Sequence, residues 1–150
     1  MKDLHSNVAV VQALTPQTVQ ASAVNSGNID KQGFDSLEII VPVGNIVTAL
    51  TATEKLELKI EHADDDGTGA PGAYAACADT DVLGFTGLAA GVFKVLDADT
   101  KDQKTYAIGY VGSRRFVKVT VTPTSITTGG PVAILVLKGS PSIAPVAQQT

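Results

Sequence analysis

Two segments of the chain alternate strictly between apolar and polar side chains. In residues 54–62, leucine and isoleucine alternate with charged residues, and residues 115–122 have valine at every second position. A period of two is typical of a β-strand with one buried face and one solvated face. Both segments are therefore predicted as strands. The side chains expected to point into the core are Leu56, Leu58, Ile60, Val117, Val119 and Val121.

Two further segments are apolar along nearly their whole length. Residues 36–43 and 131–137 are as long as ordinary strands, and glycines stand close to their ends. An uninterrupted apolar run of this length is typical of a strand that is covered on both faces. We therefore expect both faces of these two strands to be buried.

A short glycine-containing link predicts a hairpin in the second half of the chain. Residues 104–111 form another strand candidate, and only residues 112–114 separate it from the alternating strand that begins at Arg115. A link of this length and composition favours two antiparallel neighbours. Residues 8–14 and 93–96 are further strand candidates.

The sequence contains few helical signals, which favours an all-β fold. The alanine-rich residues 73–83 are flanked and followed by glycines and predict short helical turns at most. Six or seven short strands predict an all-β, single-domain β-sandwich or partly closed β-barrel. Within 150 residues, we expect a body at about 29–139, an N-terminal strand and extended arm at 1–28, and an extended, proline-containing C-terminal tail at 140–150.

Composition narrows the classes of partner. Hydrophobic residues make up 44% of the chain but aromatic residues only 5%, so the core must be aliphatic. A net charge of −4 without clustered basic residues argues against nucleic acid. No apolar run approaches the roughly 18 residues of a membrane span, and the N-terminus has no apolar signal core. We expect neither a nucleic acid nor a membrane partner, and a location in the cytoplasm or in a particle assembled there.

No catalytic or cofactor-binding pattern emerges. His5 and His62 are the only histidines and are expected to be solvated or at an interface. Cys77, the single cysteine, lies among apolar neighbours and is predicted to be an inert buried thiol. Residues 64–69 resemble the start of a calcium loop, but Ala75 stands where the bidentate glutamate should be, so an acidic turn is expected. The chain is predicted not to be an enzyme and to need no cofactor or metal.

Arg114 and Arg115 are the only adjacent basic pair in the chain. Two guanidinium groups beside a strand could clamp a carboxylate of another protein. An exposed hairpin tip explains them equally well, and the residues alone leave both interpretations open.

The order of several short segments resembles a known family. These segments are residues 2–7, 33–37, 56–65, 108–119 and 137–145. Together they are similar to the capsid decoration, or cement, proteins encoded among the head genes of tailed bacteriophages. None of the segments is a catalytic signature.

The resemblance implies a β-rich subunit, often a homotrimer, on the outer capsid surface of a virion after assembly in the host cytoplasm. There it would brace neighbouring copies of the major capsid protein and stabilise the shell. The two ends of the chain and the basic pair are the expected contacts with the capsid or with other copies. The predicted contact residues are His5, Arg114, Arg115, Pro141, Ile143 and Pro145.

Two other functions remain open. The chain could be another virion component, such as a head-to-tail stopper or a tail subunit, which would form a ring. It could also be a carbohydrate-binding or adhesin module, in which Tyr106 or Tyr110 would support a sugar. The low aromatic content argues against the second of these.

Overall fold

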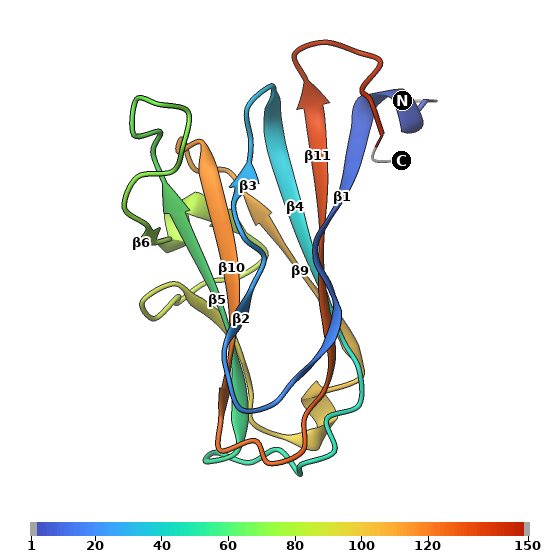
Figure 1. Cartoon of the computed structure of the whole chain (residues 1–150), viewed down its shortest axis with the longest axis vertical. Coiled ribbons are helices and arrows are strands. Elements are labelled where there is room, and N and C mark those ends of the chain that lie inside the picture. Colours follow the sequence, from blue (N-terminus) through green and yellow to red (C-terminus); the bar gives the residue numbers. More distant parts are fainter. Residues whose placement is uncertain (1–2, 149–150) are drawn as a thin grey trace.

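The structure, a computed structural model, describes residues 3–148 and contains two antiparallel β-sheets packed face to face (Figure 1). The prediction of an all-β sandwich is confirmed. Within residues 3–148, no helix is long and apolar enough to cross a membrane.

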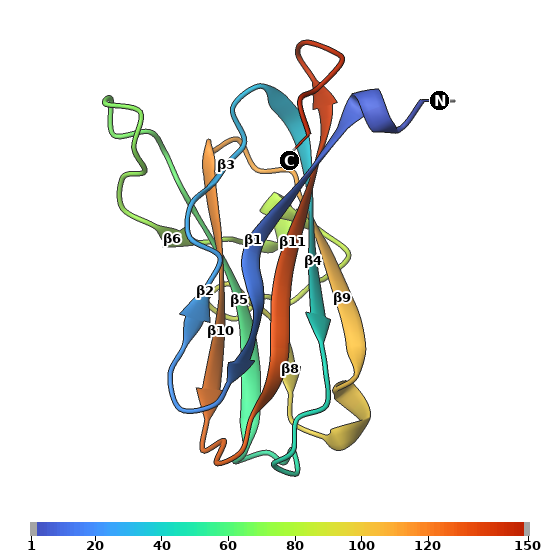
Figure 2. The ribbon, with the colours of Figure 1, turned by 45° about the vertical axis from the view of Figure 1, so that its right-hand side comes forward.

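The first sheet has five strands, and Figure 2 shows four of them, β1, β11, β4 and β9, side by side in one layer. The spatial order of all five is β1 (Val8–Val19), β11 (Gly130–Pro141), β4 (Phe34–Val43), β9 (Lys104–Tyr110) and β7 (Val82–Leu83).

The second sheet is built around two long central strands, β10 (Phe116–Thr124) and β5 (Lys55–Ala63). Short strands pair with them on either side: β2 (Val24–Asn25), β3 (Ile29–Asp30), β6 (Ala75–Ala76) and β8 (Val92–Leu96). The described residues also contain three single-turn 3-10 helices: η1 (His5–Asn7), η2 (Asp79–Asp81) and η3 (Asp99–Lys101).

The core lies between the two sheets and is mostly aliphatic, as the composition predicts. The six alternating side chains of β5 and β10 have no exposed surface, which confirms the predicted facing of both strands. They pack against the inner face of the first sheet, where Ile39, Val41, Ile108, Ile134 and Val136 are equally buried. The period of two therefore predicted which face of each of these two strands points into the core.

The predicted hairpin around Gly112 is wrong. β9 belongs to the first sheet and β10 to the second, so the link between them crosses from one sheet to the other. The backbone N–H groups of Val111 and Gly112 both donate to the carbonyl oxygen of Asp81, at 2.8 and 3.1 Å. These two bonds hold the link at β7 instead of closing a two-stranded turn.

The N-terminal region contributes more strand than its sequence pattern indicates. β1 continues to Val19 along β11, with register shifts between Gln12 and Leu14 and between Leu14 and Gln17. Each shift interrupts the alternation of side chains. The segment predicted as an N-terminal strand and arm thus supplies β1 and β2 to the sandwich.

The C-terminal segment also differs from the expected extended tail. β11 continues to Pro141, which pairs with Phe34 of β4. Residues 142–148 then return toward η1, so the described parts of both ends lie at the same end of the sandwich (Figure 1). Residues 149–150 of the predicted tail and residues 1–2 of the predicted arm lie outside the described part of the chain.

Candidate functional site

One cross-strand row on the outer face of the first sheet forms the floor of the candidate site. Strand register places one residue from each of the five strands in this row, so their side chains face the same side. In spatial order the row is Val10, Leu137, Glu38, Gly109 and Leu83.

A groove of about 650 Å³ lies over this row. We call it the apolar groove. Its walls include Leu4 beside η1, Val111 after β9 and Gln148 near the C-terminus. Large apolar side chains are unusually exposed here: Leu4 is 65% exposed, Leu83 59%, Val111 50% and Val10 45%. Contiguous exposed apolar surface of this kind is typical of an interaction site.

Glu38 is the central residue of the row and the only charged one in it. Burial raises the pKa of its carboxyl above the ordinary value. Gly109 leaves room for this side chain, because a Cβ at that position would lie 3.1 Å from Oε2 of Glu38. Within residues 3–148, the carboxylate receives no hydrogen bond and forms no ion pair. The groove thus offers a largely apolar surface with one unpaired acceptor.

Both predicted terminal contact regions lie close to this groove. His5 lines it, and the C-terminal segment folds back over η1 through three hydrogen bonds. The Val146 N–H donates to the Ser6 carbonyl at 3.1 Å. The Gln148 amide donates to the carbonyl oxygens of His5 and Val8, at 2.9 and 2.8 Å.

The predicted contact residues of the tail lie beside a second hollow. Pro141, Ile143 and Pro145 line a space of about 450 Å³ together with Phe34. Ile143 is 82% exposed and is therefore available to a partner. The contact roles of these three residues and of His5 stay predictions.

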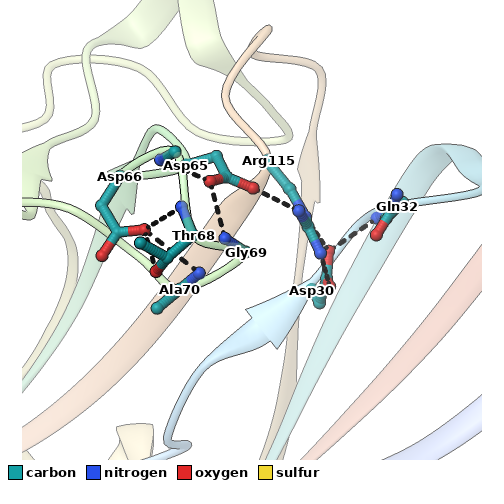
Figure 3. Close-up of polar contacts among 9 residues, drawn as sticks. Asp30, Gln32, Asp65, Asp66, Thr68, Gly69, Ala70 and Arg115 are labelled. Atoms are coloured by element: carbon teal, nitrogen blue, oxygen red, sulfur yellow. Dashed lines mark hydrogen bonds and ion pairs between the residues drawn. The ribbon is translucent and has the colours of Figure 1, made fainter.

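Arg115 binds carboxylates of its own chain (Figure 3). Its Nε and Nη2 donate to the two carboxylate oxygens of Asp30, at 3.0 and 2.7 Å, and its Nη1 donates to Asp65. The hydrogen bonds from Arg115 lower the pKa of the Asp30 carboxyl. Arg114 lies 3.5 Å from the exposed carboxylate of Asp64. An external carboxylate would have to compete with these contacts, and an external role for either arginine stays a prediction.

The acidic turn after β5 uses its carboxylates to hold its own backbone. Asp65 accepts from the N–H groups of Gly67 and Gly69, at 2.7 and 3.0 Å. Asp66 accepts from the N–H and hydroxyl of Thr68, at 2.8 and 2.6 Å (Figure 3). These bonds lower the pKa of both aspartates. The residues that suggested a calcium loop therefore form a self-capped turn.

A buried polar cluster, which the sequence pattern did not bring together, lies between the sheets. His62 is only 7% exposed, so the expectation of a solvated or interfacial histidine is wrong. Its Nδ1 lies 2.9 Å from the hydroxyl of Tyr110, which has no exposed surface and cannot support a sugar. Cys77 is buried as predicted, and burial raises the pKa of its thiol to about 12.

The apolar groove was not among the predicted sites, although one sequence signal pointed to it. The apolar runs of β4 and β11 predicted that both faces of these strands are covered. In the structure their inner faces meet the second sheet, whereas Ile40, Leu135 and Leu137 on the outer face remain partly exposed. Apolar residues without a cover are the signal that could have located the groove.

The fold and the groove define a two-sheet β-sandwich with an apolar outer face. No family model matches the chain, and no curated protein matches it either. Among solved structures, the SPBc2 prophage-derived protein YomS is 15% identical with a TM-score of 0.43, and the match covers 89% of this chain and 94% of that chain.

Two other solved structures are similar over most of their length. A protein of the Bacillus endospore appendages, described as disulfide-linked pili, is 14% identical, with a TM-score of 0.34 and coverage of 93% of this chain and 96% of its own. A family 6 carbohydrate-binding module is 11% identical, with a TM-score of 0.30 and coverage of 89% and 94%. All three TM-scores are below 0.5, and these likenesses carry no argument about function.

Proposed function

We propose that this protein is a non-enzymatic structural component of a virion, and specifically a head decoration protein that binds the outer capsid surface. The observation that carries the proposal is the outer face of β4 and β11, which is apolar in sequence yet left partly exposed by residues 3–148. A partner that covers this face would bury the outward apolar side chains of β4 and β11. The sequence resemblance to decoration proteins supports the capsid as that partner.

The groove specifies the chemistry of the surface that it would accept. Four exposed apolar side chains around it favour aliphatic or aromatic residues on the partner. Glu38 favours a lysine or arginine among them, because a carboxylate that loses its water needs a cation or several donors in return. We therefore expect the major capsid protein to present an apolar segment that carries one basic residue.

Binding of this kind would stabilise a shell by linkage. A protein that binds the assembled shell but not its separated subunits shifts the equilibrium toward the shell by its binding free energy. In a homotrimer, three groove contacts act together, and avidity can exceed single-site affinity by about a hundredfold. Bridging of neighbouring capsid subunits then follows from the spacing of the three copies.

Purified particles provide the test. The expected result is a copy number close to that of the major capsid protein, release of the decoration protein as a trimer, and loss of heat resistance in particles that lack it. A few copies per particle would identify a stopper or tail component instead. A monomeric protein whose removal leaves particle stability unchanged would overturn the proposal.

A further inference from the structure

Three side chains with metal-binding atoms converge in the buried polar cluster. One ligand atom each from His62, Cys77 and Asp81 lies within 4.8 Å of the others. His62 is on β5, Cys77 follows β6 and Asp81 closes η2. The first two are buried and the third is half-buried, so the cluster is enclosed on the core side and accessible beside Asp81.

We propose that His62, Cys77 and Asp81 form a binding site for one zinc(II) ion, with a water molecule as the fourth ligand. Imidazole nitrogen, thiolate sulfur and carboxylate oxygen are the ligands that zinc prefers, and three protein ligands plus water are a common set. Tetrahedral coordination at normal bond lengths separates ligand atoms by roughly 3.3–3.8 Å. The ligand atoms lie within 4.8 Å of one another, so they must approach each other by up to about 1.0–1.5 Å when the ion binds.

The charges in the cluster suit a divalent cation. A thiolate and a carboxylate supply two negative charges, and a neutral imidazole adds none, so the bound ion would be neutralised. Binding replaces the S–H bond of Cys77 with a zinc–sulfur bond and releases the proton to solvent. The nearby guanidinium of Arg114 opposes the ion, but Asp64 lies 3.5 Å from it and offsets its charge.

Neighbouring groups already orient each of the three ligands. The Tyr110 hydroxyl lies 2.9 Å from Nδ1 of His62 and holds the imidazole ring in place. A ligating histidine usually has such a partner on its other nitrogen. The Ala78 N–H donates to Oδ2 of Asp81 at 2.8 Å and leaves the second oxygen free to coordinate. The Cys77 N–H donates to the Ile60 carbonyl at 3.3 Å.

The site would connect the two halves of the sandwich. His62 belongs to the second sheet, whereas Asp81 directly precedes β7 of the first sheet. An ion held by both residues would tie the sheets together in a chain whose single cysteine excludes an internal disulfide. This role is independent of what covers the apolar groove.

Cobalt(II) and zinc(II) titrations of the reduced, metal-free full-length protein test the site. We expect one cobalt ion per chain, a thiolate-to-cobalt charge-transfer band, loss of that band on addition of one equivalent of zinc, and a higher Tm with zinc. Cys77→Ser should lose the band because it removes the thiolate, and Cys77→Ser and His62→Gln should each weaken zinc binding at least about tenfold. Circular dichroism of the metal-free variants verifies that they fold.

Two further variants separate direct coordination from a merely structural effect. Glu57→Gln removes a half-exposed carboxylate on the outer face of β5, five residues from His62, that is not a ligand, and binding should be retained. Tyr110→Phe keeps the ring but removes the hydroxyl that positions His62, and zinc affinity should fall about tenfold. Absence of the charge-transfer band in folded wild-type protein, or a band that survives Cys77→Ser, would overturn the proposal.

Discussion

Glu38 lies directly opposite Leu137 in the ladder between β4 and β11, and both residues line the apolar groove. A carboxylate beside an aliphatic side chain loses water without gaining a partner, which is why its pKa is raised. The pair joins the two properties of the groove, its apolar surface and its single unpaired charge.

The first prediction concerns stability and pH. Because the folded protein holds the Glu38 proton more tightly than the ordinary pKa of 4.5 implies, the stabilising contribution is complete below about pH 4.5. It is lost as the pH rises through the raised pKa. Glu38→Gln should therefore raise the Tm at pH 7, by about 2 °C, and should have less effect at pH 4.

Thermal unfolding across this pH range is the measurement for Glu38. Asp35→Asn, on the same strand but exposed, serves as the control and should change the Tm little at either pH. A Glu38→Gln variant that is less stable than wild type at pH 7 would show that the carboxylate has a partner.

The second prediction concerns the apolar groove as a docking surface. Val10→Asp and Leu83→Asp change exposed side chains, so both variants should fold normally. Burying each half-exposed aliphatic chain contributes about 1 kcal/mol to association, and a new carboxylate must also be desolvated. Binding to particles stripped of the protein should weaken at least about tenfold for each variant.

Val47 provides a matched control for the groove. It is 64% exposed but does not line the groove. Val47→Asp should bind stripped particles like wild type. Equal loss of binding in all three variants would indicate a general surface effect and would contradict docking through the groove.

The sequence predicted the elements whose side chains alternate without interruption. The inner faces of β5 and β10 follow from Leu58 and Val119 and their neighbours, because burial on one side of a regular strand imposes a period of two. The same period places His62 on the inward face, two residues after Ile60, and only the adjacent buried Ala63 departs from the alternation. The burial of His62 was therefore predictable from the period of two, and the expectation of a solvated or interfacial histidine followed residue type instead of position.

Other features depend on contacts between distant segments. The sequence of residues 112–114 does not reveal whether the link closes a hairpin or crosses between sheets; the carbonyl of Asp81 determines this through its bonds to Val111 and Gly112. The row that joins Val10 to Leu83 requires the register of five strands, which no local pattern contains. The only sequence signal of the candidate groove was therefore that β4 and β11 carry apolar residues on both faces.

The third prediction concerns the core. Val119 has no exposed surface and faces inward from β10. Val119→Asp should prevent folding, because burying an unpaired carboxylate costs several kcal/mol, a large part of the usual net stability. Thr120→Asp, on the opposite face of the same strand, should yield folded protein. Soluble expression and circular dichroism distinguish the two, and a folded Val119→Asp variant would contradict the assigned facing.

The fourth prediction concerns Arg115 and the acidic turn. Arg115→Lys keeps the charge but loses the planar fork that reaches Asp30 and Asp65 together. The turn of residues 64–70 should become more sensitive to limited proteolysis, and the Tm should fall slightly. Arg114→Lys, which loses only a single 3.5 Å contact with Asp64, should change neither. Equal cleavage of wild type and Arg115→Lys would show that the turn holds itself without the arginine.

The fifth prediction concerns the C-terminal segment. Truncation after Pro141 removes the hydrogen bonds that Val146 and Gln148 make with the segment from His5 to Val8. The sandwich should keep its Tm within a few degrees, because these contacts lie outside the core. The backbone of η1 should exchange hydrogen faster, and particle binding should weaken because η1 forms one wall of the groove.

Truncation after Gln148 is the matched control, since it keeps all of these bonds. Hydrogen exchange of residues 4–9 and binding to stripped particles should then equal wild type. If truncation after Pro141 also leaves both properties unchanged, the C-terminal segment neither orders η1 nor contributes to docking, and the groove must function with the sheet face alone.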